Sequence, residues 1–179
     1  FDLEESMFLK SFFGKIYDHI DVVMISLMRK FDEVGWYSAA RRILEGLWLI
    51  PNIITEAVYP ELASRYLVSK ALVSKLFDKS YKYMLIVSVM VSLGTVIIAS
   101  ALIHLVYGSD FKNSAIVLIL LGLAVIPSFL RYLFGTTLIA INFQKTETVV
   151  SAGRSAFNVA ANLVMIPLYG YIGATIATV

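Results

Sequence analysis

The chain of 179 residues is 59% apolar and only 16% charged, and its mean hydropathy is +0.79. Soluble domains are nearer half apolar and a quarter charged, so these values exclude intrinsic disorder and argue against a soluble globule. The 15 basic and 13 acidic residues nearly cancel, which gives no indication of a nucleic-acid partner. The absence of cysteine excludes disulfides and thiolate zinc sites. The composition predicts an all-α fold, a polytopic bundle of transmembrane helices.

Five complete spans and a truncated sixth are predicted in chain order. Their approximate bounds are 7–28, 36–64, 83–107, 114–142, 148–166 and 170–179. The third span is the clearest, because it carries no formal charge and is long enough to cross a bilayer with some tilt. The fourth contains Pro127, which should kink it. Because the chain begins at Phe1 and its last span has about half the length needed for crossing, we expect a piece of a longer protein.

The first two spans are weaker because both contain charged residues. A helix that faces lipid on all sides could not carry these charges, whereas a helix with one face on protein or on a wet cavity could. The runs 22–28 and 47–54 are strongly apolar, which favours membrane spans. Two soluble helices beside a membrane domain are the alternative.

Residues 65–82 combine lysines with apolar residues at a spacing of four, Val68, Leu72 and Leu76. This pattern is typical of a basic amphipathic helix lying in the membrane interface, and a solvated loop is the alternative. Placing this segment in the cytoplasm satisfies the positive-inside rule. Eight basic residues then lie on the cytoplasmic side (Lys10, Arg65, Lys70, Lys75, Lys79, Lys82, Lys145, Arg154) and three on the outer side (Arg29, Lys30, Lys112).

Arg131 is the charge that the sequence places deepest in the membrane. It lies 14 residues before Lys145 and 19 after Lys112, about 21 Å and 28 Å along a helix. An arginine at that depth costs roughly 2.5–3.5 kcal/mol on insertion scales, so it needs a carboxylate partner, a water-filled cavity or an anionic ligand. A cavity is the favoured interpretation, because charges inside the membrane mark transport pathways. The alternative is a buried ion pair with Glu45, Glu56 or Asp21.

One face of the second span is predicted to be polar and aromatic along its whole length. Six residues at spacings of three or four fall within about 80° of arc. They are Arg41, Glu45, Trp48, Asn52, Glu56 and Tyr59. Pro51 frees the carbonyl of Leu47, which is tolerated at membrane depth beside a cavity or a neighbouring donor. The number of charged members favours a cavity wall. An intrahelical pair of Arg41 with Glu45, and packing of the rest against another helix, is the alternative.

Polar residues also share helix faces in the first and fifth spans. Asp18 and Asp21 lie three residues apart, and two nearby carboxylates in a low dielectric suit proton or cation coupling. Simple neutralisation by basic residues, with an arginine as the partner of Asp21, is the slightly favoured alternative. Arg154, Asn158 and Asn162 lie at four-residue spacing, and the asparagines are expected to bond across helices.

The sequence contains no signature of catalysis or metal binding. HExxH, GxSxG and GxxxxGK motifs are absent, as is any paired metal-ligand spacing. We therefore expect neither an enzyme nor a resident metal or cofactor.

Three stretches, taken in order, carry a family resemblance. The first starts at Asp21 with an apolar run, continues as VGxYxxA at 34–40 and ends at Pro60; the second is YGxxF at 107–111. The third is NxxxNxxxIPxYGxxGAxxAT at 158–178. Together they resemble the polysaccharide (O-antigen type) flippase family of the multidrug/oligosaccharidyl-lipid/polysaccharide exporter superfamily.

The resemblance implies a transporter of two lobes that form an inverted V and work by alternating access, with this chain as part of the second, C-terminal lobe. Such a protein moves a polyprenyl-diphosphate-linked oligosaccharide to the outer leaflet of the cytoplasmic membrane. Its expected partners are the bilayer, this substrate and the N-terminal lobe of the same protein.

The resemblance also implies roles for the polar residues of the cavity. Arg131 and Arg41 would offer charge to the diphosphate and to sugar acids, because a guanidinium bonds phosphate bidentately. The sugar would be contacted by Trp48, Asn52, Glu56 and Tyr59, and a cation could be coupled by Asp18 and Asp21. Two other functions stay open: a multidrug or cation antiporter of the same superfamily, and a non-transport polytopic membrane subunit.

Overall fold

The computed structural model describes residue 12 and residues 20–178, and every element in this part of the chain is helical, as predicted. Residues 20–28 form a helix. After them come α2 (Phe31–Leu47), α3 (Leu49–Tyr66), α4 (Lys70–Tyr107), the 3-10 helix η1 (Ser109–Phe111), α5 (Ser114–Leu123), α6 (Val125–Ala140) and α7 (Gln144–Thr178). Most of the predicted first span, 7–28, lies outside the described residues, and so does Asp18.

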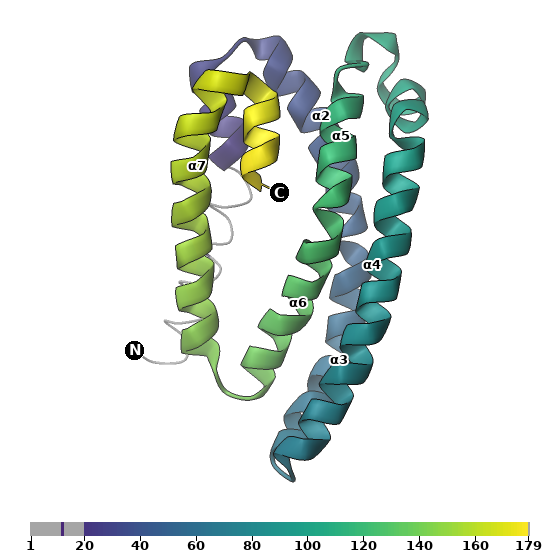
Figure 1. Ribbon diagram of the computed structural model, residues 1–179, viewed down its shortest axis with the longest axis vertical. Helices are drawn as coiled ribbons and strands as arrows, with labels where there is room; N and C mark the ends of the chain where they lie inside the picture. The colour runs from purple at the N-terminus through teal and green to yellow at the C-terminus, as the bar shows by residue number, and fades with distance from the viewer. Residues whose placement is uncertain (1–11, 13–19, 179) are drawn as a thin grey trace.

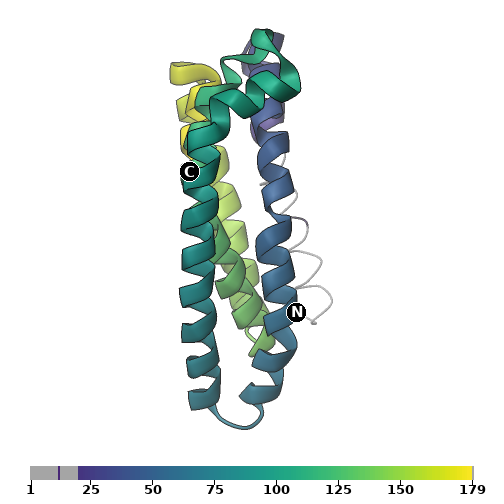
Figure 2. The same ribbon diagram turned by 90° about the vertical axis from the view of Figure 1, so that its right-hand side faces the viewer.

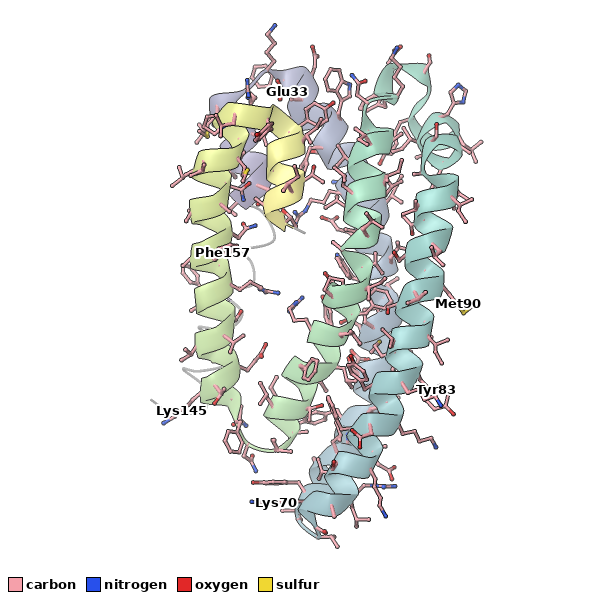
Figure 3. The ribbon with its side chains drawn as sticks, in the orientation of Figure 1. Glu33, Lys70, Tyr83, Met90, Lys145 and Phe157 are labelled. Atoms are coloured by element: carbon pink, nitrogen blue, oxygen red, sulfur yellow. The ribbon has the colours of Figure 1, made fainter. Side chains whose placement is uncertain are left out.

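The chain descends through α2 and α3, rises along α4, descends through α5 and α6 and rises again along α7, so its connections gather at the two ends of the bundle (Figure 1). The connections at 29–30, 108–113 and 167–171 lie at one end, and those at 67–69 and 141–143 lie at the other. Glu33 marks the first end, whereas Lys70 and Lys145 mark the second (Figure 3). This arrangement agrees with the predicted alternation of the connections. Which end faces the cytoplasm stays a prediction.

The chain is a membrane protein by the length and composition of its helices. Among the described residues, α4 and α7 are long and apolar enough to cross a membrane, and α5 with α6 makes a third span if the bent pair counts as one. Large apolar side chains stand on their outer faces, with Ile97 78% and Phe157 73% exposed. Such faces are what helices in contact with lipid present. The predicted number, five spans and a truncated sixth, is not confirmed.

Residues 65–82 belong to two helices and the turn between them, and their location in the membrane interface stays a prediction. Residues 65–66 end α3, residues 67–69 make a turn, and residues 70–82 are the first turns of α4. The Ser69 hydroxyl caps this helix by accepting from the N–H of Ala71 at 3.2 Å. Residues 61–93 contain no glycine or proline, and α4 continues unbroken for 38 residues, about 57 Å (Figure 2).

Two breaks in the helices each come three residues before a proline. α2 gives way to α3 at Trp48, before Pro51, so the predicted span 36–64 is two helices. α5 and α6 meet at Ala124, before Pro127, and their axes differ by 46°. Proline offers no N–H to the carbonyl four residues earlier, and its ring crowds that carbonyl, which explains the loss of regular helix at these two positions. The kink predicted in the fourth span is confirmed.

The predicted spans 148–166 and 170–179 are two arms of α7 that fold back at Gly170 (Figure 1). Gly170 has φ 62° and ψ −141°, a backbone conformation that costs little only for glycine. Gly173, on the returning arm, lies so close to the carbonyl of Met165 that a Cβ atom would collide with it. The two glycines therefore allow a helix to reverse and pack against itself.

Charged side chains at the start of α2 and in the connection before it cap both ends of this reversal. Arg29 Nε donates to the carbonyl of Ile166 at 3.1 Å, and Arg29 Nη2 donates to that of Pro167 at 2.9 Å. Glu33 Oε2 accepts from the N–H of Tyr171, the first residue after the glycine, at 3.1 Å. The helix dipole favours a cation such as Arg29 at C-terminal carbonyls. It likewise favours a carboxylate such as Glu33 at an N-terminal N–H.

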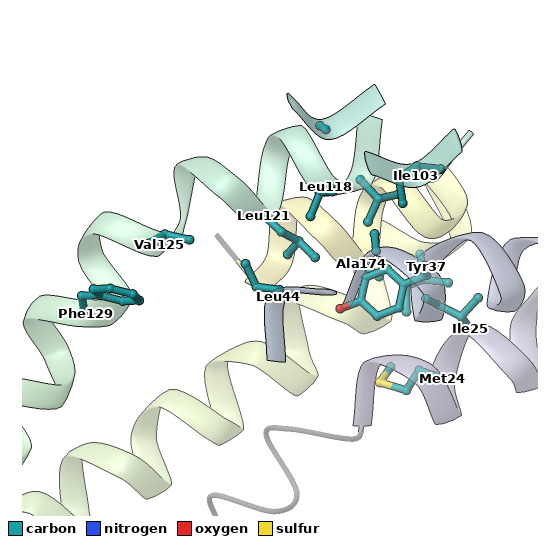
Figure 4. Packing of buried hydrophobic residues seen from close by; sticks show 14 of the residues in the cluster. Met24, Ile25, Tyr37, Leu44, Ile103, Leu118, Leu121, Val125, Phe129 and Ala174 are labelled. Atoms are coloured by element: carbon teal, nitrogen blue, oxygen red, sulfur yellow. The ribbon is translucent and has the colours of Figure 1, made fainter. Parts of the chain in front are cut away.

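The main apolar core joins residues 20–28 to α2, α4, α5, α6 and α7 (Figure 4). Its largest fully buried side chains include Ile25, Tyr37, Leu118, Leu121 and Phe129. A smaller cluster of Leu62, Val73 and Ala140 joins α3, α4 and α6 near the opposite end. The main core therefore packs residues 20–28 and five helices against one another.

The three stretches that carry the family resemblance meet in space. Trp36 Nε1 donates to the carbonyl of Asp110 at 3.3 Å, which joins the first stretch to the second. Asn162 Nδ2 donates to Asp21 Oδ1 at 2.8 Å, which joins the first stretch to the third. These stretches therefore hold one end of the bundle together.

Candidate functional site

Both proline breaks border one cavity of about 280 Å³ between α2, α5 and α6. Trp48 and Ala124, the residues at the two breaks, are both on its wall. The full lining comprises Arg41, Leu44, Glu45, Trp48, Leu121, Ala124, Ser128, Arg131, Tyr132 and Thr178. A pocket with apolar walls and a few convergent polar groups is typical of a ligand site.

The cavity brings together residues that the sequence placed on two different spans. Arg41, Glu45 and Trp48 are the first three members of the predicted stripe, and they come from α2 and the break after it. Arg131 faces them from α6. The tertiary structure thus places the predicted arginines on the wall of the same cavity.

Arg131 is half-buried, and its guanidinium carbon lies 4.8 Å from the centre of the Tyr132 ring. The rings of Phe129 and Tyr132 each lie 6.0 Å, centre to centre, from that of Trp48, so an aromatic surface flanks the charge. Among the described residues, no carboxylate lies within ion-pair distance of Arg131. The three ion pairs that formed the alternative interpretation are therefore not present.

Arg41, by contrast, contacts two carboxylates. Its Nη1 atom lies 3.0 Å from Asp21 Oδ2, and its Nε atom lies 3.5 Å from Glu45 Oε1 one turn further along α2. The Asp21 side chain is wholly buried, whereas that of Glu45 is 47% exposed. The arginine partner expected for Asp21 is thus Arg41, and Arg41 enters the cavity with its charge already balanced.

Asp21 is the centre of a buried polar cluster beside the cavity. In addition to Arg41, its Oδ2 atom accepts from the Tyr37 hydroxyl at 2.8 Å and from the Thr178 hydroxyl at 3.0 Å. Its Oδ1 atom accepts from Asn162 at 2.8 Å. The cluster joins the 20–28 helix, α2 and both arms of α7, so it couples the reversal of α7 to the cavity wall.

The asparagines of α7 bond across its two arms. Asn162 Nδ2 also donates to Asn158 Oδ1 at 3.1 Å, and Asn158 Nδ2 donates to the carbonyl of Ala177 on the returning arm at 3.3 Å. Arg154 lies one turn before Asn158 and is half-buried. Buried amides that bond in this way hold helices together where hydrocarbon offers no alternative partner.

The last two members of the predicted stripe, Glu56 and Tyr59, border a different cavity. Glu56 and Tyr59 line a space of about 240 Å³ together with Thr55 of α3 and with Thr136 and Ile139 of α6. The break at Trp48 divides the stripe between the two cavities. Asn52 lies between them on α3 and lines neither in the part of the chain that the structure describes.

Sequence reasoning missed three polar members of the first cavity, Ser128, Tyr132 and Thr178. Ser128, Arg131 and Tyr132 are spaced by three and one, so they share a side of α6, and this spacing could have revealed two of them. Thr178 had no such signal, because only the reversal at Gly170 brings it beside Arg41. The described residues contain no group of three His, Asp or Glu side chains able to hold a metal.

Comparison with known families gives a match over residues 1–116 to the polysaccharide biosynthesis protein family. The chain belongs to this family. The matched residues run from the N-terminus into the start of α5, so they include Arg41, Glu45 and Trp48 and exclude Arg131. The family match therefore covers the α2 side of the cavity but not the α6 side.

One curated relative is the probable low-salt glycan biosynthesis flippase Agl15 of Haloferax volcanii. It is 22% identical over 182 residues, and the alignment covers 99% of this chain and 38% of the relative. The chain thus spans about two fifths of the length of this relative. No solved structure matches the chain. The matched family is described as polysaccharide biosynthesis proteins, and the relative is named as a flippase of glycan biosynthesis.

Proposed function

We propose that this chain forms part of the C-terminal lobe of a flippase that moves a polyprenyl-diphosphate-linked oligosaccharide across the cytoplasmic membrane. The protein is then a multi-pass transporter of that membrane and not an enzyme. The family match, the name of the Haloferax volcanii relative and the polar cavity between α2 and α6 support this proposal.

The observation that best supports the proposal is the environment of the Arg131 guanidinium. A guanidinium on the wall of a polar cavity, flanked by aromatic rings and with no carboxylate partner among the described residues, lacks a counter-charge. A diphosphate supplies that counter-charge and matches the planar fork of the arginine bidentately. Arg41 contributes less, because Asp21 already neutralises it.

The size and chemistry of the two cavities suit the two parts of the substrate head group. A space of about 280 Å³ is near the lower limit for ligand pockets, enough for a diphosphate but not for an oligosaccharide. The second cavity presents a carboxylate, two threonine hydroxyls and a tyrosine, which suit the hydroxyls of a sugar. The remainder of the head group would contact the other lobe of the transporter.

Alternating access requires that some helices bend. In this proposal the breaks at Trp48 and Ala124 act as hinges, since both lie beside the cavity and each precedes a proline that supplies no N–H to the helix. A ligand bound at Arg131 would then be held between the two flexible points.

The test is transport of a fluorescent diphosphate-linked glycan lipid by the full-length protein in vesicles. Loss of a charge-assisted hydrogen bond costs roughly 1.5–3 kcal/mol, so Arg131→Ala should lower transport by about 10- to 150-fold. Arg131→Lys should keep part of the activity. Arg65→Ala is a matched control, because Arg65 bonds exposed Glu61 at the far end of α3.

Normal transport by Arg131→Ala, or an equal loss in the Arg65 control, would contradict the assignment of Arg131. A second assay separates the alternative function. Ion-dependent efflux of a dye from the same vesicles, without movement of the glycan lipid, would favour the multidrug or cation antiporter.

A further inference from the structure

The start of α4 carries a row of lysines on the face that continues as its lipid-facing side. Lys75, Lys79 and Lys82 are spaced by four and three residues, which places them on one side of the helix. The same spacing of three or four leads on to exposed apolar residues, Ile86, Met90, Leu93 and Ile97. One continuous face of α4 therefore changes from basic to apolar at about residue 83.

The lysines of this face are exposed and free of ion pairs within the described residues. Lys75, Lys79 and Lys82 are all exposed, and none lies within 4.0 Å of a carboxylate in that part of the chain. Asp78 is the single acidic residue between 70 and 82. At the neighbouring end of α3, Glu61 is occupied by Arg65 at 2.6 Å. Within the described residues, the three lysines thus form no ion pair, and Asp78 offsets only one of their charges.

The geometry of α4 puts these lysines at the level of lipid headgroups. The apolar part, 83–107, is about 37 Å long at 1.5 Å per residue, slightly more than the hydrocarbon core. Tyr83 follows the last lysine and is 57% exposed, in the position that aromatic residues take at a membrane interface. Tyr83 and Met90 both point away from the bundle on the outer side of α4 (Figure 3).

We propose that Lys75, Lys79 and Lys82 form a binding surface for the headgroups of anionic phospholipids in one leaflet of the membrane. The charge of the surface is complementary to such headgroups, and the surface is continuous with the face that contacts their acyl chains. A lysine on a flexible stem serves as a point charge for phosphate without requiring a fixed geometry. The surface lies on the outside of α4, away from the cavity that holds Arg131, so its role is separate from substrate binding.

The test measures which lipids the full-length protein retains in the absence of substrate. Native mass spectrometry would compare phosphatidylglycerol with phosphatidylcholine on the wild type, the triple glutamine variant of Lys75, Lys79 and Lys82, and the triple arginine variant. Juxtamembrane charges contribute about five-fold each, so the glutamine variant should lose on the order of 100-fold in preference for phosphatidylglycerol. The arginine variant should keep it. Lys30→Gln with Lys112→Gln, at the opposite end of the bundle, is the matched control and should keep most of it.

Three results would overturn the proposal. They are a wild type that shows no preference for the anionic lipid, a glutamine variant that retains the preference, and a control variant that loses as much as the triple variant. If the wild type showed no preference for the anionic lipid, a protein would be the partner that the lysines bind. Because no substrate is present in the assay, these outcomes do not depend on whether the protein transports a glycan lipid.

Discussion

Replacement of Asp21 by asparagine tests whether the buried cluster stabilises the bundle. Asparagine keeps the volume of aspartate but removes its charge and turns an N–H₂ group toward donors. In the structure, Oδ2 accepts from Tyr37, Arg41 and Thr178, and Oδ1 accepts from Asn162. At least one of these bonds must be lost in either orientation of the amide.

The size of the effect follows from burial. Hydrogen bonds between helices in a membrane are worth about 0.6 kcal/mol each, and removing one partner of a buried ion pair costs about 3–5 kcal/mol. Arg41 keeps the half-exposed Glu45 as a second partner, which reduces the loss. We expect Asp21→Asn to lower the free energy of unfolding by about 3 kcal/mol. Glu45→Gln removes the other carboxylate of the same arginine and should cost less than about 1 kcal/mol, because its side chain is 47% exposed.

The assay is unfolding of the full-length protein in mixed micelles by a denaturing detergent, followed by far-UV circular dichroism. Replacing a buried ion pair on both sides by uncharged residues is often nearly neutral, so Asp21→Asn with Arg41→Met should be less damaging than Asp21→Asn alone. Equal losses for Asp21→Asn and Glu45→Gln would refute the argument, since burial would then not decide which carboxylate matters.

Two further predictions concern the backbone. Gly173→Ala should destabilise the protein by several kcal/mol in the same assay, because the added methyl group collides with the backbone of the other arm of α7. Gly153→Ala is the control: its methyl group meets no atom within 4 Å, so it should be neutral or slightly stabilising. Similar stability of both variants would show that the arms are not in contact. Pro127→Ala should let α5 and α6 straighten from their angle of 46°. The distance between the start of α5 and the end of α6, measured by pulsed electron-spin resonance, should then increase by about 3 Å. An unchanged distance would mean that packing rather than proline maintains the bend.

Local chemistry made several features of the fold predictable. The kink at Pro127 and the freed carbonyl near Pro51 follow from the missing N–H of proline, which acts on residues only four positions away. The helical stripe that starts at Arg41 was visible because three or four residues separate neighbours on one face. The structure nevertheless divides that stripe at Trp48, so only its first three members reach the cavity of Arg131.

The candidate site could be assembled only in part from the sequence. Periodicity identifies which residues share a helix face, but not which other face lies opposite. Arg131 and Asp21 were both recognised as charges that need partners, yet it is Arg41 that contacts Asp21. Thr178 donates to Asp21 across 157 positions of sequence, a contact that no local rule anticipates.

By itself, the sequence determined that this chain is helical, belongs in a membrane and bends near Pro127, because hydrophobicity and backbone chemistry act locally. The tertiary structure alone decided that α4 runs unbroken from its lysines into the apolar face and that α7 reverses at Gly170. It also decided that Arg131 pairs with no carboxylate in the part of the chain that the structure describes. These outcomes depend on how the helices pack, and packing assigns each buried charge to one neighbour among several that the sequence allows.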